Sequence, residues 1–348
     1  MWITSSLDTV LTPTAIALGN FDGLHRGHQQ VIQPILKRHS PLDSRQRTEM
    51  LLTNPVTLLT WDRGLLDNNL GESQPCYSTV VTFHPHPQEF FTGQPKKLLT
   101  PLDEKAEWLK TMGVEQWVLL PFDEQMATLS PREFVERILI QKLQPRCISV
   151  GFDFRFGKKR TGTVKDLEKI AGHHGIKVKT VPLYLCENGE RISSSEIRTS
   201  LEKGAIRRAN QLLGRSYHLV GSVVQGQQLG RTIGFPTANL HLPPEKFFPR
   251  SGVYAVKVSE TENNANLGLV NHPGVMNIGC RPTVAGQTIT VEVHLLNWSG
   301  DLYGKTLKVS LEEFLRPEQK FPSLESLTTQ IQADCLHATE VLAVESQK

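Results

Sequence analysis

The sequence predicts two domains: an N-terminal α/β domain with a parallel sheet covered by helices on both faces, and a C-terminal antiparallel β-barrel or sandwich that ends in a helix. The 348 residues exceed the usual size of one domain. Strand-like and helix-like segments alternate in the first half, which is typical of parallel sheets. Near Gly214 glycine and proline become frequent, and short β-rich segments follow one another.

Individual elements follow from local patterns. The first domain is expected to contain strands at residues 14–21, 79–83, 117–121, 147–151 and 177–183. Ser130, Pro131 and Glu133 form a helix-start signal with a capping box. Residues 40–78 make an unusually long connection for a compact α/β unit and are interpreted as a surface insertion.

The second domain is expected to contain strands at residues 218–224, 252–258, 275–279, 289–298 and 305–315. A helix is predicted from Ser323 onward because apolar residues recur at three- and four-residue steps and form one stripe. The stripe consists of Leu324, Leu327, Ile331, Cys335, Ala338 and Leu342. We interpret it as packing against the strands.

Composition excludes several classes of protein. The net charge of +3, from 38 basic and 35 acidic residues, is too balanced to indicate a nucleic-acid partner. No segment approaches the roughly 20 apolar residues of a membrane helix, and the N-terminus lacks the pattern of a signal peptide. Five scattered cysteines favour reduced thiols in the cytoplasm. The oligomeric state stays open.

Polar or glycine-rich motifs follow four predicted strands. They read GNFDG, HPHP, PFDE and GFDFRFGKKR. Ligands of open α/β sheets bind at the carboxyl ends of the strands, so the four motifs predict a ligand site at that edge. In the first motif a helix start follows, with Gly27 between His25 and His28, a combination that suits a phosphate group. The histidines could equally be surface residues, and a zinc site with His84 and His86 is the weaker alternative.

A second motif, NGERISSSEIRTSL, predicts a helix that begins at Ser193, with Glu196 in the capping-box position. Arg198 then lies in the first turns, where the helix dipole opposes a cation unless an anion binds there. A surface arginine on a capped helix is the alternative. In the second domain, Glu292 alternates with Val291 and Val293, so it faces away from the core. Such a glutamate is usually only a solvated sheet residue.

These motifs resemble those of known enzymes. His25-Arg26-Gly27-His28 resembles the H-x-G-H signature of nucleotidyltransferases, and ISSSEIR resembles its partner motif I-S-S-T-x-x-R. VTFHPHPQEF and GFDFRFGKKRTG resemble bacterial FMN adenylyltransferases, and Pro236-Thr237-Ala238-Asn239 resembles the P-T-A-N signature of riboflavin kinases. Nearly the whole chain resembles the prokaryotic bifunctional FAD synthetases. It departs from them at Ser195, at His84 and in the length of residues 40–78.

The resemblance implies a Rossmann-like FMN adenylyltransferase domain at residues 1–203, a linker at 204–214 and a riboflavin kinase barrel at 215–348. The first domain would convert FMN and ATP to FAD and pyrophosphate, with His25, His28 and Arg198 as catalytic residues. Further nucleotide or phosphate contacts would be Gly19, Phe21, Gly27, Asp153, Arg155, Lys158, Arg160, Ser194 and Ser195. Its flavin contacts would include Asn20, Asp22 and Pro85.

The second domain would phosphorylate riboflavin to FMN. The resemblance makes Glu292 the catalytic base, and it places Mg²⁺ and nucleotide at Thr237 and Asn239. Gly230 and Gly234 would contact the nucleotide, and Arg281, Arg316 and Phe321 the flavin. Riboflavin, FMN, FAD and ATP are the partners so implied. The alternatives are an enzyme with one silent module, and a flavin-binding regulator, although no basic recognition helix is evident.

Overall fold

The computed structural model describes residues 1–36, 76–186, 189–226, 229–261, 268–283 and 286–345. Most of the predicted surface insertion at 40–78 therefore lies outside the described residues. The chain forms two compact units, which are treated separately below. The first comprises Met1–Lys96 and Leu102–Ile192, and the second comprises Lys97–Pro101 and Ser193–Lys348.

The first unit contains a six-stranded parallel sheet with the strand order β1-β4-β3-β2-β5-β6. Its strands are β1 (Trp2–Thr4), β2 (Thr14–Leu18), β3 (Tyr77–His84), β4 (Gln116–Pro121), β5 (Pro145–Gly151) and β6 (Lys177–Val181). All five predicted strands are confirmed. Strand β1 was not predicted, because three residues are too few to show an alternating pattern.

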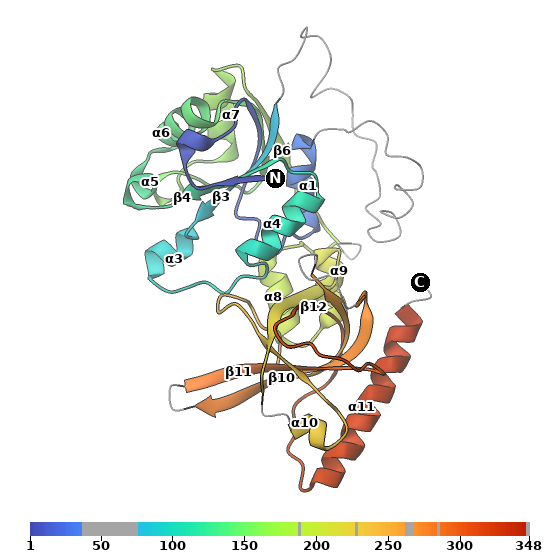
Figure 1. Ribbon diagram of the computed structural model, residues 1–348. Coiled ribbons are helices and arrows are strands. Elements are labelled where there is room, and N and C mark those ends of the chain that lie inside the picture. The colour runs from blue at the N-terminus through green and yellow to red at the C-terminus, as the bar shows by residue number, and fades with distance from the viewer. Residues whose placement is uncertain (37–75, 187–188, 227–228, 262–267, 284–285, 346–348) are drawn as a thin grey trace. The chain divides into compact units, whose positions relative to one another are not determined.

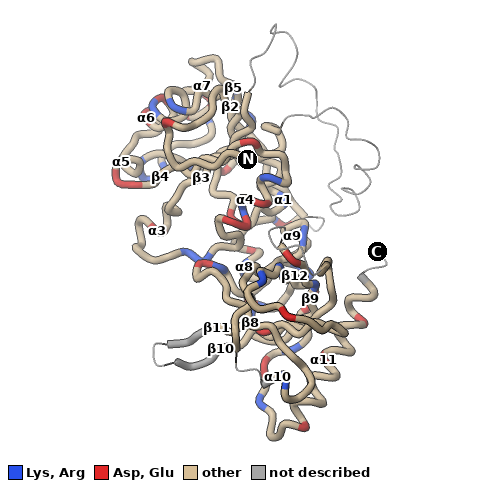
Figure 2. Tube along the Cα trace, viewed as in Figure 1, with Lys and Arg blue, Asp and Glu red and all other residues tan. Residues whose placement is uncertain are grey.

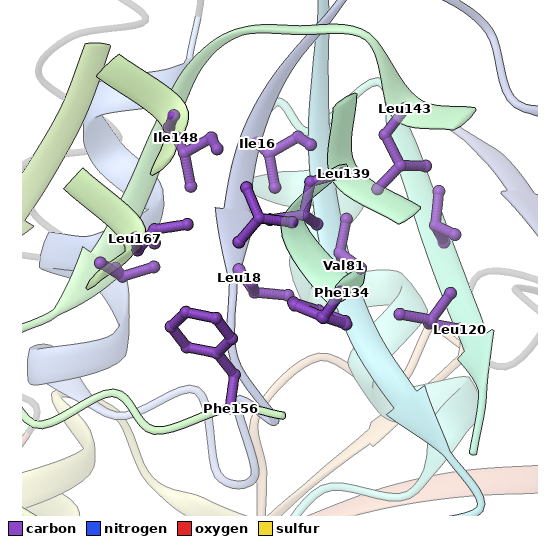
Figure 3. Packing of buried hydrophobic residues seen from close by; sticks show 14 of the residues in the cluster. Ile16, Leu18, Val81, Leu120, Phe134, Leu139, Leu143, Ile148, Phe156 and Leu167 are labelled. Atoms are coloured by element: carbon purple, nitrogen blue, oxygen red, sulfur yellow. The ribbon is translucent and has the colours of Figure 1, made fainter. Parts of the chain in front are cut away.

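Helices cover both faces of this sheet, as predicted. Successive side chains of a strand point to opposite faces, and β2 shows the consequence: Ile16 and Leu18 belong to one buried cluster, whereas Ala15 and Ala17 belong to another. The first cluster also holds residues from two helical segments, as Figure 3 shows for Leu139, Leu143 and Leu167. Because both of its faces are buried, β2 reads as an almost continuous apolar run.

The helical segments of the first unit are short. They are η1 (Leu7–Thr9), α1 (Arg26–Ile32), η2 (Gln33–Ile35), α3 (Pro87–Thr92), α4 (Leu102–Thr111), α5 (Glu124–Thr128), α6 (Pro131–Glu133), η3 (Phe134–Leu143), η4 (Lys158–Arg160) and α7 (Val164–Gly172). The predicted capping box is present: the Ser130 hydroxyl accepts from the Glu133 N–H, and the Glu133 carboxylate accepts from the Ser130 N–H. The helix continues beyond α6 as the π-helical turns of η3.

The second unit is a closed antiparallel barrel with the strand order β10-β11-β8-β7-β12-β9. Its strands are β7 (Tyr217–Val224), β8 (Ala238–His241), β9 (Gly252–Glu260), β10 (His272–Thr283), β11 (Gly286–Leu295) and β12 (Thr306–Arg316). The predicted barrel is confirmed, although β8 was missed because it has only four residues. Four helices accompany it: α8 (Ser194–Glu202), α9 (Ile206–Leu213), α10 (Leu229–Thr232) and α11 (Leu324–Glu345).

The terminal helix α11 lies along the barrel, in contact with β9, β10 and β12 (Figure 1). Its predicted apolar stripe has two roles. Ala338 and Leu342 are buried against the barrel, as expected for packing. Leu327 and Ile331 instead line a cavity, and Leu324 is 59% exposed. The packing interpretation is therefore wrong for the first half of the stripe.

The division between the units differs from the predicted boundaries. Residues 204–214, predicted as a linker, are largely helix α9, and its residues Ile206, Ala209, Leu212 and Leu213 are buried. Helix α8 packs on α9, and α9 packs on β7 and β12. Residues 193–203 therefore belong by packing to the unit that holds the barrel. The prediction followed the change in composition near Gly214, whereas packing starts earlier.

Candidate active sites

The turn after β2 is shaped by close contacts. Phe21 and Leu24 adopt positive φ angles of 49° and 43° and are almost completely buried. Gly19 fits closely there, because an added Cβ would lie 3.1 Å from the Phe21 ring. Asp22, at 4% exposure, is buried as well. Close packing thus fixes the shape of the turn. The turn follows the carboxyl end of β2, where ligands of open α/β sheets bind.

His25 and His28 begin the helix that follows. His25 is the N-cap of α1, and its Nδ1 accepts a hydrogen bond of 3.2 Å from the His28 N–H. A neutral His25 must then carry its proton on Nε2. The two rings are stacked, with centroids 3.6 Å apart. Gly27 permits this arrangement, since an added Cβ would lie 3.2 Å from the His25 ring. Two imidazolium charges at this distance would repel each other, and a bound anion would reduce that repulsion.

A buried polar network supports the same turn. The Lys105 ammonium donates to the Asn20 carbonyl oxygen at 2.9 Å, and the Asn20 side chain contacts His86 Nε2 at 3.1 Å. Burial lowers the pKa of Lys105 to about 8, against the opposing attraction of Asp22. Burial and the nearby Lys96 lower the pKa of His86 to about 4, so His86 is neutral at pH 7. Lys105 was not predicted as a site residue, and His86 was considered only as a ligand of the alternative zinc site. Pro85 lies beside the network, between β3 and α3.

The loop after β5 carries the predicted basic residues. Arg155, Lys158 and Arg160 are all exposed there. Asp153 forms an ion pair with Arg191, which sequence reasoning did not select. Of the three alternating phenylalanines, Phe156 is buried in the core and Phe154 packs against it, whereas Phe152 is 45% exposed. Among the described residues, no group of three or more His, Cys, Asp or Glu side chains is suited to hold a metal ion.

The motif around Arg198 lies in the second unit. Ser193 caps α8 by accepting from the Glu196 N–H, as predicted. Ser194 and Ser195 form the first turn of the helix. The Arg198 guanidinium donates to the Lys97 carbonyl oxygen at 3.1 Å and lies 5.5 Å from the centre of the Phe247 ring. Packing therefore groups these residues with the barrel, whereas His25 and His28 belong to the first unit.

The second unit contains a cavity of about 320 Å³. Six of the predicted residues line it: Gly230, Thr237, Asn239, Glu292, Arg316 and Phe321. The cavity also reveals polar residues that were not predicted. These are Asn277, His294, Glu318, Gln319 and Asp334. The apolar part of the wall includes Val253, Val275, Leu327 and Ile331, which suits an aromatic ligand with a few polar contacts.

Strand register explains why the central polar residues meet. Glu292 of β11 lies opposite Asn239 of β8 on one side and opposite Asn277 of β10 on the other. Side chains that are directly opposite in an antiparallel sheet lie about 5 Å apart at Cβ. Val291 and Val293 are buried in the core, as predicted, which turns Glu292 to the cavity face. Asn277 could not be selected from the sequence, because its neighbour on β11 depends on the register.

Two glycines of the glycine-rich segment pack closely against Asn239 and Phe235. An added Cβ at Gly226 would lie 2.2 Å from the Asn239 amide nitrogen, and one at Gly230 would lie 2.3 Å from the Phe235 carbonyl oxygen. Gly234 has a φ of 86°, which favours glycine, but it is not among the residues that line the cavity. Arg281 lies in β10 opposite Thr288. Its side chain is outside what the structure describes.

Each half of the chain matches a family of known proteins. A family model described as FAD synthetase matches residues 8–55 and 67–196, and one described as riboflavin kinase matches residues 213–342. A bifunctional riboflavin kinase/FMN adenylyltransferase of Escherichia coli K12 is 37% identical over 326 residues, which cover 93% of this chain and 91% of the relative. One from Bacillus subtilis is 34% identical and covers 92% and 90%, respectively.

The parallel-sheet unit with paired histidines at a helix start and the barrel unit with its cavity correspond to the two modules that the family models describe, and together they define a transferase with two modules. With the matches to both family models, the assignment becomes specific. The chain belongs to the bifunctional riboflavin kinase/FMN adenylyltransferase family. It is an enzyme that phosphorylates riboflavin to FMN and adenylylates FMN to FAD.

A solved structure extends the fold comparison. It is described as a macrolide-efflux protein from Streptococcus pneumoniae, and it is similar with a TM-score of 0.74 and 28% identity over 95% of this chain and 96% of that one. The likeness supports the two-unit architecture. In this chain, no helix among the described residues is long and apolar enough to span a membrane.

Proposed function

We propose that the cavity of the second unit is the riboflavin kinase site. The observation that carries the proposal is the meeting of Thr237 and Asn239, from one motif, with Glu292, from a distant stretch of sequence, in one cavity. Hydroxyl, amide and carboxylate oxygens are ligands that suit Mg²⁺. Thr237 and Asn239 would hold the ion with ATP, and it would neutralise charge on the phosphates.

Glu292 is the catalytic base in this proposal. Its carboxylate accepts the proton of the ribityl 5′-hydroxyl while that oxygen forms a bond to the γ-phosphorus of ATP. The bond between the γ-phosphorus and the bridging oxygen breaks, and ADP leaves. Gly230 and Gly234 would shape the nucleotide loop. Phe321 and Arg281 would contribute to the flavin side.

We propose that the H-x-G-H motif, which contains His25 and His28, serves adenylyl transfer. A phosphate oxygen of FMN forms a bond to the α-phosphorus of ATP, and the bond to pyrophosphate breaks. His25 and His28 would stabilise the charge that develops at the α-phosphate, and Arg198 would hold the pyrophosphate. The remaining nucleotide contacts would come from Gly19, Phe21, Gly27, Asp153, Arg155, Lys158, Arg160, Ser194 and Ser195. The turn at Asn20 and Asp22, with Pro85, would contact the flavin.

Function and packing divide the chain differently in this proposal. The adenylyltransferase module spans 1–203 and the kinase module 215–348, yet residues 193–203 pack with the second unit. Helix α8 is thus part of the first module by function and of the second unit by packing. The use of ATP, together with five cysteines that are scattered through the sequence, supports a cytoplasmic location.

A product assay tests the pair of assignments. Riboflavin, ATP and Mg²⁺ are incubated with the full-length protein, and the flavins are separated by chromatography. We expect FMN to appear first and FAD to follow. FMN without FAD would indicate a silent first module, and the absence of any product would favour a flavin-binding regulator.

Replacing Gly226 with alanine tests the fit of the glycine loop. The added methyl group must displace the Asn239 amide, which lies 2.2 Å from its position. If Asn239 holds the Mg²⁺–ATP complex, the KM for ATP in FMN formation should rise by about tenfold or more. The matched control is Gly172→Ala in α7, where an added Cβ meets nothing within 4 Å. An unchanged KM in Gly226→Ala would remove Asn239 from the nucleotide site.

A further inference from the structure

The loop at residues 317–322, between β12 and α11, forms part of the cavity wall. It contributes Glu318, Gln319 and Phe321. The facing wall comes from the first half of α11, through Leu327, Ile331 and Asp334. The shape of the cavity therefore depends on what holds this loop and this helix together.

Arg316, the last residue of β12, connects the two. Its Nε donates to both carboxylate oxygens of Asp334, at 2.9 and 3.1 Å, and a terminal nitrogen donates to Asp334 Oδ2 at 2.7 Å. The other terminal nitrogen donates to the Pro317 carbonyl oxygen at 3.1 Å. The Phe321 ring lies 5.7 Å from the guanidinium carbon.

This ion pair is shielded from water. The Arg316 side chain is 18% exposed and the Asp334 side chain 7%. Gln330 adds a hydrogen bond of 3.0 Å to Asp334 Oδ1. Charge-assisted, two-pronged contacts between arginine and carboxylate are among the strongest in proteins, and they fix the direction of the guanidinium plane. All three guanidinium nitrogens donate to groups of the protein itself.

We propose that Arg316 and Asp334 are positioning residues for riboflavin phosphorylation. Asp334 fixes the Arg316 guanidinium, and the guanidinium in turn fixes the loop through the Pro317 carbonyl and the Phe321 ring. The loop then holds Glu318 and Phe321 at the cavity for the flavin ring system. This changes the predicted role of Arg316, from a direct flavin contact to a support of the wall. The inference rests on the proposed kinase site.

The first experiment measures both reactions in the full-length protein. In Asp334→Asn the negative charge of the carboxylate and part of the two-pronged contact with Arg316 are lost, so the loop is held less firmly. We expect the KM for riboflavin to rise by about tenfold or more, because a hydrogen bond to a charged group is lost. The conversion of FMN to FAD should stay at the wild-type rate. Glu340→Gln, on the exposed side of α11, is the matched control and should alter neither reaction.

A second variant separates positioning from stability. Arg316→Met combined with Asp334→Leu removes both charges, so no unpaired charge is buried. The melting temperature of this double variant should therefore be closer to that of the wild type than the melting temperature of Asp334→Asn is. The KM for riboflavin should nevertheless stay raised, because Pro317 and Phe321 have lost their partner. A KM that recovers together with stability would overturn the proposal, and so would an unchanged KM in Asp334→Asn. Glu292→Gln is measured alongside: if it still forms FMN, the site assignment itself fails.

Discussion

Glu292→Gln should abolish FMN formation while FMN is still converted to FAD. Glutamine keeps the size of the side chain and its place opposite Asn239 and Asn277, but it cannot accept the substrate proton. The loss of a general base costs about 10²- to 10⁴-fold in rate. Two assays on one protein sample provide the measurement: ADP release with riboflavin, and pyrophosphate release with FMN.

The second assay is also the control for folding, since it uses the other module of the same chain. If the variant is folded and loses both activities, Glu292 does not act as the base of a separate site. If it retains rapid FMN formation, the assignment of the kinase site to this cavity fails.

His28→Ala should have the opposite effect. It removes the ring that stacks on His25 at 3.6 Å and meets the Phe21 ring edge-on at 5.3 Å. If this ring stabilises the α-phosphate as charge develops, FAD formation from FMN should fall by about 10²- to 10³-fold. Riboflavin phosphorylation should be unaffected. The measurement is pyrophosphate release at saturating FMN and ATP.

An exposed histidine of the same unit provides the comparison. His174→Ala, just after α7, should leave both reactions at wild-type rates. If His28→Ala produces FAD as fast as His174→Ala does, His28 has no part in adenylyl transfer. Its contact with His25 would then serve only to shape the helix start.

The long elements of the fold could be predicted from the sequence, and the short ones could not. Strands β2 and β4 carry apolar runs, because both faces of the sheet are buried there. Strands β1 and β8 have three and four residues and show no period. Helix α9, within the predicted linker, was not seen for a different reason: it is stabilised by four buried residues that meet other elements, which composition does not reveal.

Candidate site residues could be selected from the sequence where a motif is local, and their roles stay predictions. Thr237, Asn239 and Glu292 were selected from short patterns, and they do meet at one cavity. Asn277 and Asp334 were missed because their importance arises from strand register and from helix packing. Lys105 was missed because a lysine in a polar helix usually faces solvent, whereas here it is buried beside Asn20.

The short segment Lys97–Pro101 has a consequence for how the chain must be assembled. Leu98 pairs with Lys246 in a parallel bridge, and the fully buried Lys246 ammonium donates to the Leu99 carbonyl oxygen, 147 positions earlier in the chain. During synthesis on a ribosome, this early segment must wait for its partner until most of the polypeptide has emerged. A gene cut at the codon for residue 203 would therefore separate the two partners. The N-terminal product would carry Leu98 without its bridge partner, and the C-terminal product would carry the Lys246 ammonium without the Leu99 acceptor.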